Sequence, residues 1–262
     1  GTFLPTLSTP SRTTGSVSIG NTEPLGASGN FSINQQGTGS LTLTGAVDRS
    51  NSGQINLTAA NGSITALDAL TARFGIAVSA PAGTLSLGQL STGGGSSNGN
   101  ITLQSSGDLT FASLLASAPS ANSGNITISS GSGSVQTTAD TIGNDVVGSG
   151  NVGISAGQAI GNGNFTNPLD IQSGVNNAVT LTAGFNIGAL AKPVNVNTTG
   201  TIEVASTGGQ YHVAATDGMA SRPVKTIRLS ASAACIGNAN SATFTSADLD
   251  VTATGTGTSV DI

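Results

Sequence analysis

The sequence predicts an all-β protein: a single-stranded right-handed parallel β-helix with three walls, about 24–25 residues per coil and about 11 coils. Three observations lead to this prediction. Short apolar–polar alternations recur through the chain, they advance together at one period, and small turn residues separate them. Alternation with period two is typical of a half-buried strand, and a fixed period of a few tens of residues is the signature of a solenoid.

The first strand of each coil is predicted from two apolar residues that flank one other residue, as in Ile126 and Ile128. The first members of these pairs are Phe31, Ile55, Ile76, Ile101, Ile126, Val152, Val179, Ile202 and Ile227. Successive members lie 21–27 residues apart, with a mean of 24.5. A disordered polar tract has no reason to keep such a period, so the Gly- and Ser-rich composition does not indicate disorder here.

Two further apolar series predict the second and third strands of each coil. The second series is Leu41, Ile64, Leu85, Leu109, Val135, Ile160, Ile187, Val213 and Ile236, and the weaker third series is Val47, Leu70, Leu90, Leu114, Ile142, Leu169, Val194, Met219 and Phe244. Three strands per coil predict three walls, stacked in parallel at about 4.8 Å. Residues 66–73 are the nearest candidate for a helix, but Gly and β-branched residues disfavour helices in general.

Glycine and asparagine mark the corner before the first strand of many coils. Gly precedes Asn or another polar residue in Gly29-Asn30, Gly53-Gln54, Gly99-Asn100, Gly124-Asn125, Gly150-Asn151 and Gly200-Thr201. A sharp corner often needs a positive φ, which Gly adopts without steric cost. Asn at one position of stacked coils can form hydrogen bonds along the stack, or it can simply tolerate the corner.

Composition excludes several classes of function. Only 7% of the 262 residues are charged, and the net charge of −5 opposes nucleic-acid binding. One His and one Cys cannot form a His/Cys metal cluster or an internal disulfide, and we expect no cofactor. Cys235 lies in an apolar context and is expected to be a buried free thiol. Since no apolar segment reaches about 20 residues, no membrane span is predicted.

The ends of the chain carry no recognisable caps. Residues 1–30 are expected to form an irregular first coil or an N-terminal contact segment, with Leu7 24 residues before Phe31. Residues 31–262 are expected to form one continuous β-solenoid that is uncapped at its C-terminal end. The start has neither Met nor the features of a signal peptide, so we expect an excised or processed piece. Alternatively, uncapped ends pair head to tail with further copies.

Several segments resemble the repeats of filamentous haemagglutinin-like adhesins, exoproteins of the bacterial two-partner secretion pathway. The resemblance is carried by Gly124-Asn125-Ile126-Thr127-Ile128, by Asn61-Gly62-Ser63-Ile64-Thr65 and by residues 159–171 and 173–183. It covers residues 30–250 through short motifs. It implies an extended right-handed β-helix, export to the outer surface, and a role in attachment or biofilms. The repeats of this family carry no catalytic residues.

Carboxylates raise the alternative of a β-helical polysaccharide-degrading enzyme, which needs clustered acids on one wall. Near the predicted third wall lie Asp48, Asp68, Asp145, Asp170 and Asp248. Because Asp is ordinary at turns, we expect structural roles and no enzymatic activity. An ice-binding Thr ladder is also disfavoured, since Asn56, Gly153, Glu203 and Arg228 interrupt it.

One region differs from the rest of the repeat. Residues 203–228 hold five of the 19 charged residues together with the only Tyr, His and Met. Exposed aromatic and charged groups can mark binding, so Tyr211, His212, Arg222 and Lys225 form the candidate ligand or contact patch. The alternatives are a divergent coil that carries a loop, and a contact surface at one end of the rod.

Taken together, the sequence predicts a structural fibre component, secreted or displayed on a bacterial cell surface. The rod is expected to assemble end to end with further copies or to form part of a longer filament. The main alternative is an adhesin segment in which the Tyr211/His212 coil contacts host or matrix glycans.

Overall fold

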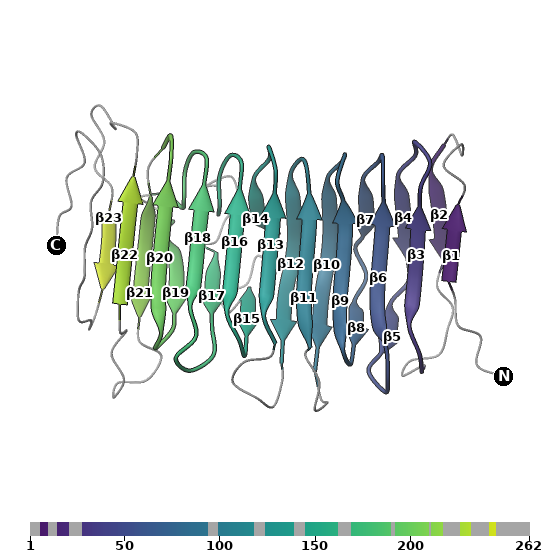
Figure 1. Cartoon of the computed structure of the whole chain (residues 1–262), viewed down its shortest axis with the longest axis horizontal. Helices are drawn as coiled ribbons and strands as arrows, with labels where there is room; N and C mark the ends of the chain where they lie inside the picture. The colour runs from purple at the N-terminus through teal and green to yellow at the C-terminus, as the bar shows by residue number, and fades with distance from the viewer. Residues whose placement is uncertain are drawn as a thin grey trace.

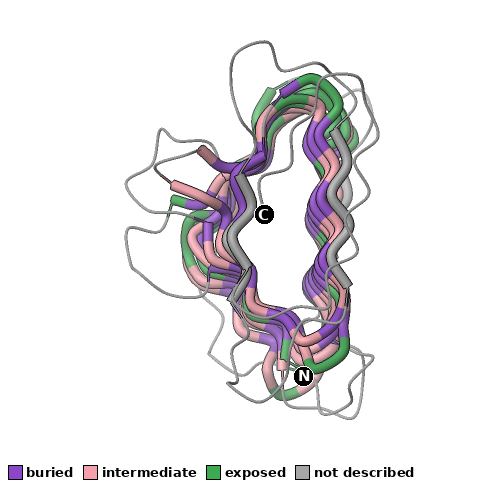
Figure 2. Tube along the Cα trace, turned by 90° about the vertical axis from the view of Figure 1, so that its left-hand side faces the viewer, coloured by how far each residue is buried: buried purple, intermediate pink, exposed green. Residues whose placement is uncertain are grey.

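The protein is a parallel β-solenoid in the computed structural model, which describes residues 6–9, 15–20, 28–93, 99–117, 124–138, 145–161, 169–189, 192–209, 211–216, 226–231 and 241–244. Every regular element in these ranges is a β-strand. The strands form two sheets that lie on opposite sides of the solenoid and run along one axis (Figure 1 and Figure 2). All pairs of named strands are parallel, because each strand lies beside its counterpart one coil further along the chain.

The bounds of the strands follow the repeat. The first sheet contains, in order, β1 (Thr6–Thr9), β3 (Phe31–Gln35), β6 (Gln54–Ala59), β9 (Gly75–Ala80), β11 (Asn100–Ser105), β13 (Ile126–Ser130), β16 (Val152–Ala156), β18 (Val179–Ala183), β20 (Thr201–Ser206) and β22 (Thr226–Ala231). The second sheet contains β2 (Val17–Gly20), β4 (Leu41–Thr44), β7 (Ile64–Ala66), β10 (Leu85–Thr92), β12 (Leu109–Ala116), β15 (Val146–Gly148), β17 (Asp170–Gln172), β19 (Val194–Asn197), β21 (His212–Thr216) and β23 (Ser241–Phe244), together with β5 (Val47–Arg49), β8 (Leu70–Ala72) and β14 (Val135–Thr137).

The first apolar series, here called the first ladder, is confirmed at every step; the second and third series are called the second and third ladders. Phe31 lies opposite Ile55, and each later member lies opposite the next one, as far as Ile202 and Ile227. Between Phe31 and Ile202 the winding is continuous over about seven turns. The predicted total of about 11 coils extends into residues outside the described ranges.

The second and third ladders share one sheet. β10 pairs with β7 through its first half and with β8 through its second half. Three separate walls are therefore not confirmed, and the right-handed sense stays a prediction. Viewed along the axis, the first sheet is the nearly straight wall on the right of Figure 2, and the second sheet bends around the other side. The strand β8 also replaces the helical alternative over residues 66–73.

The registers of the weaker ladders differ from the prediction at several places, among them Phe244, which lies opposite Ala215 instead of Met219. Leu114 pairs with Val146, and Ile142, predicted there, lies outside the described residues. Ile187 forms a bridge with Tyr211, while Val213 pairs with Val194. Met219, Cys235 and Ile236 also lie outside the described residues.

The N-terminal coil starts two residues out of the predicted register. Leu7 lies opposite Ile33 instead of Phe31, whereas Val17 lies opposite Leu41 as the spacing predicts. The division at residue 30 stays a prediction, since only residues 6–9, 15–20 and 28–30 of that segment are described. The expectation of an uncapped C-terminal end falls on residues 245–262, outside the described part.

One continuous apolar core fills the solenoid. The inward-facing Ile, Leu and Val side chains from Phe31 to Val213 belong to a single buried cluster. At the corner after the first sheet the inward position is small in nearly every coil: Ala59, Ala80, Ser105, Ser130, Ala156, Ala183 and Ser206. Serine hydroxyls here bond to the turn, as Ser105 Oγ does to the Gly107 carbonyl at 2.7 Å. The exception is Gln35, which is fully buried opposite Ala59 and accepts a hydrogen bond from the Gly37 N–H, so the polar groups of this corner are satisfied as well.

Asparagines form the hydrogen-bond ladder that the corner pattern allows. The Asn100 side-chain oxygen accepts from the Asn125 backbone N–H at 2.9 Å, and Asn125 accepts from Asn151 at 2.7 Å. Asn151 in turn accepts from the Ala178 N–H at 2.7 Å. Each carboxamide thus joins one coil to the next along the axis.

Removing one member of this ladder should cost measurable stability. We expect Asn125→Ala to lower the free energy of unfolding by about 1 kcal/mol, because the Asn151 N–H loses its acceptor. Asn125→Asp keeps the acceptor and should lie close to the parent protein. Urea unfolding followed by circular dichroism measures both, with Asn34→Ala on the outer face as control. Equal losses in Asn125→Ala and Asn34→Ala would show that the ladder does not stabilise the stack.

Candidate functional site

The structure buries the first half of the predicted patch. Tyr211 is 3% exposed and continues the second ladder after Ile187, and His212 is 5% exposed. The backbone N–H of His212 donates to the Ile187 carbonyl at 2.7 Å. Burial lowers the pKa of the His212 imidazole. Arg222 and Lys225 lie outside the described residues. The patch stays a prediction, but neither Tyr211 nor His212 offers an open aromatic surface.

Two of the five predicted third-wall carboxylates lie together. Asp145 and Asp170 occupy the same position of successive coils, and the Asp145 carboxylate accepts from the Asp170 backbone N–H at 3.0 Å. On the next coil Asn195 donates its side-chain N–H to Asp170 at 2.6 Å. Asp48 and Asp68 instead accept from the backbone N–H groups of Ser50 and Gly45. Asp248 lies outside the described residues.

Burial dominates the electrostatics of this pair. Asp145 is 3% exposed, and desolvation together with the nearby Asp170 raises its pKa to about 6, against the lowering effect of its hydrogen bonds. The folded protein therefore keeps a proton on Asp145 to a higher pH than the unfolded chain does.

The contribution of Asp145 to stability should consequently fall as the pH rises from about 4 to about 6, and stay level above that range. Below pH 4 both states are protonated, so the contribution of Asp145 is fully present there. We expect Asp145→Asn to flatten this slope, with a change of about 1–2 kcal/mol across the window, because Asn is neutral at every pH. Urea unfolding at a series of pH values tests this, and an unchanged slope would contradict it.

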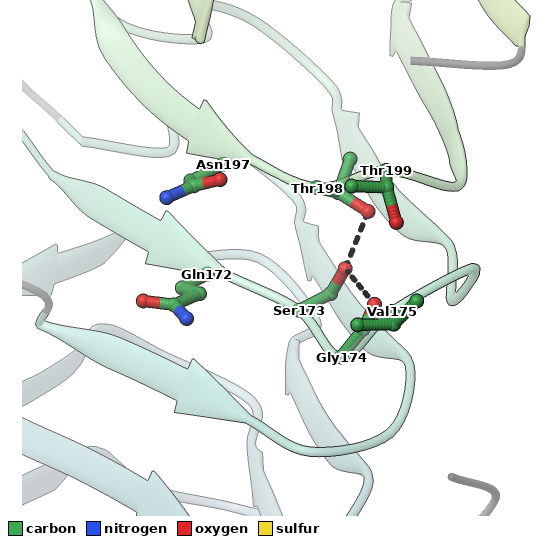
Figure 3. A pocket seen from close by; sticks show the side chains of 7 residues that line it. All are labelled: Gln172, Ser173, Gly174, Val175, Asn197, Thr198 and Thr199. Atoms are coloured by element: carbon green, nitrogen blue, oxygen red, sulfur yellow. Dashed lines mark hydrogen bonds between the residues drawn. The ribbon is translucent and has the colours of Figure 1, made fainter. Parts of the chain in front are cut away.

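A small pocket opens at the corner between β17 and β19. It has a volume of about 70 Å³ and is lined by Gln172, Ser173, Gly174, Val175, Asn197, Thr198 and Thr199 (Figure 3). The Ser173 hydroxyl lies 2.6 Å from that of Thr198, and both side chains are buried. Val175 at the rim is 43% exposed. Such a volume holds about two water-sized groups, far less than the several hundred Å³ typical of a small-molecule site.

Two carboxamides lie beside the pocket and were not identified from the sequence. Gln172 and Asn197 are paired in register, and Figure 3 shows their side chains pointing away from the Ser173 and Thr198 hydroxyls. Both are half-buried, and neither side chain has a hydrogen-bond partner among the described residues. The signal that could have found them is their separation of 25 residues, one period of the repeat.

A buried arginine was also missed. Arg49 is 1% exposed, and its guanidinium lies over the Phe31 ring at 5.4 Å from the centroid. One of its terminal nitrogens donates to the Ser28 carbonyl at 3.4 Å. A cation over an aromatic face is stabilised by the ring quadrupole, so Arg49 fills this corner of the core as a structural group.

The described residues contain no group of three His, Cys, Asp or Glu side chains placed to hold a metal ion. In the same ranges there is no helix of the length and apolar character that a membrane crossing requires.

The fold places the chain in the class of parallel β-solenoids. Comparison with protein-family models, with curated proteins and with solved structures finds no match.

Proposed function

We propose that the chain is one section of a rigid fibre, secreted or displayed on a bacterial cell surface, in the manner of filamentous haemagglutinin-like exoproteins. The single observation that supports this best is the unbroken parallel register of the first sheet above one continuous apolar core. Bending such a rod breaks backbone hydrogen bonds and core contacts together, so the rod is stiff. The proposal includes a right-handed three-walled coil and no enzymatic activity.

The proposed end-to-end assembly is based on the fact that a stack of coils can be extended by further coils. A terminal coil leaves the backbone groups of its strands without a neighbour, and a further coil, from the same chain or another copy, satisfies them. We therefore propose end-to-end stacking of copies or continuation within a longer chain. Both arrangements give filaments of single-solenoid width.

Electron microscopy of native surface material, labelled with an antibody against this chain, tests the proposal. We expect thin, unbranched filaments that carry the label along their length. Label confined to compact globular particles would overturn it.

A second candidate function is an adhesin segment that binds host or matrix glycans. The observation in its favour is the carboxamide pair Gln172 and Asn197, since an amide offers both a donor and an acceptor to sugar hydroxyls. A glycan array probed with the parent protein and with Gln172→Ala/Asn197→Ala tests it, with Gln136→Ala as the matched control. Binding that is absent, or unchanged in the double variant, would contradict it at this site.

A further inference from the structure

The outer face of the first sheet is long, flat and almost free of charge. Its outward positions form two columns, here called the neutral face: Ser32, Asn56, Ala77, Thr102, Thr127, Gly153, Thr180 and Glu203 in one, and Asn34, Thr58, Ser79, Gln104, Ser129, Ser155, Thr182 and Ala205 in the other. Within these columns Glu203 is the single charged member, and Arg228 of β22 lies opposite it in register just beyond them. The wall itself is nearly straight in Figure 2.

The middle of this face is open to solvent. Thr102, Gln104, Thr127 and Ser155 are all exposed, and they come from the three neighbouring strands β11, β13 and β16. No side chain there is larger than Gln104. A second flat surface can therefore approach over the whole width of the sheet without being held off by long charged side chains.

We propose that the neutral face pairs laterally with the neutral face of a second copy of this chain. The eight described strands from β3 to β20 extend over about 34 Å at 4.8 Å per step, and five residues of strand span about 17 Å. The contact then covers nearly 600 Å² on each partner, or about 1,150 Å² in total by this estimate. This total exceeds the roughly 1,000 Å² that a specific interface needs.

The chemistry of the face fits a copy of itself better than a charged partner. Hydroxyl and amide groups both donate and accept hydrogen bonds, so two identical faces related by a two-fold axis can satisfy each other. Neutral groups also cost less to desolvate than charges do. The central strands of this face carry no charge, so no like-charge repulsion opposes the contact of two copies.

Lateral pairing goes beyond the proposed fibre, because a fibre of single rods needs no side-to-side contact. The two proposals therefore fail separately. End-to-end growth lengthens the particle at constant cross-section, whereas lateral pairing doubles the cross-section at constant length.

The test compares the same substitution on the two sheets. Gln104→Lys places a charge near the middle of the neutral face, and Gln89→Lys places one on an exposed position of β10 in the second sheet. Small-angle scattering and analytical ultracentrifugation over a range of concentrations report mass and cross-section. We expect a doubled mass and cross-section for the parent protein and for Gln89→Lys, and single rods for Gln104→Lys.

Mixing variants separates a charge effect from damage to the fold. Gln104→Glu alone should also remain single, and an equimolar mixture of Gln104→Lys and Gln104→Glu should recover paired rods. Either variant tests the face if the other does not fold, as judged by circular dichroism. A parent protein that stays a single rod at every concentration, or that only lengthens, would overturn the proposal. Pairing that survives in Gln104→Lys would overturn it as well.

Discussion

Leu103→Ala should lower the free energy of unfolding by about 2–5 kcal/mol, the usual cost of emptying a fully buried leucine site. Leu103 is wholly buried in the middle of the first sheet, where it lies between Val78 and Ile128 of the adjacent coils. Truncation removes contacts on both sides of the coil. The cavity cannot close easily, because the backbone hydrogen bonds on either side fix the distance between coils.

The adjacent residue supplies the control. Thr102 points to solvent from the same strand, so Thr102→Ala should change stability by no more than about 0.5 kcal/mol. Urea unfolding followed by circular dichroism measures both variants. Equal losses at the two positions would mean that the alternation does not separate core from surface, and the solenoid would then be the wrong fold.

The parts of the fold that could be predicted are the strands in which buried and exposed side chains alternate strictly. The first ladder is correct from Phe31 to Ile227 because strands of five or six residues with strict alternation leave only one face to bury. The third ladder is less regular because its strands are short. β15 has three residues, and the register moves from the expected Ile142 to Val146.

The candidate site could be predicted only in part, since it depends on where a side chain points. Tyr211 and His212 stand out by residue type, yet Tyr211 is part of the core, opposite Ile187. The sequence pattern predicts Val213 as the member of the second ladder that follows Ile187, so Tyr211 was not expected in the core. Asp145 and Asp170 were correctly assigned to one region, but their stacking depends on a register that the ladders alone did not determine.

Gly62→Ala and Gly153→Ala should have opposite effects although the chemical change is identical. At Gly62 an added Cβ would come closer than 3.0 Å to the backbone of Gly39, its counterpart one coil earlier. Gly83 meets Gly62 in the same way, and later Gly157 and Gly184 stack likewise. A Cβ cannot be accommodated there unless the coils move apart, so we expect a loss of about 1–3 kcal/mol.

Gly153 lies on an outward position of β16, where an added Cβ meets nothing within 4 Å and φ is not positive. Alanine there restricts the unfolded chain without a clash, so Gly153→Ala should stabilise the protein by about 0.4–1 kcal/mol. Thermal and urea unfolding of both variants measure the difference. Losses of similar size would show that the stability cost arises from any change in the repeat, whereas opposite signs would identify the glycine stack as the feature that sets the spacing of the coils.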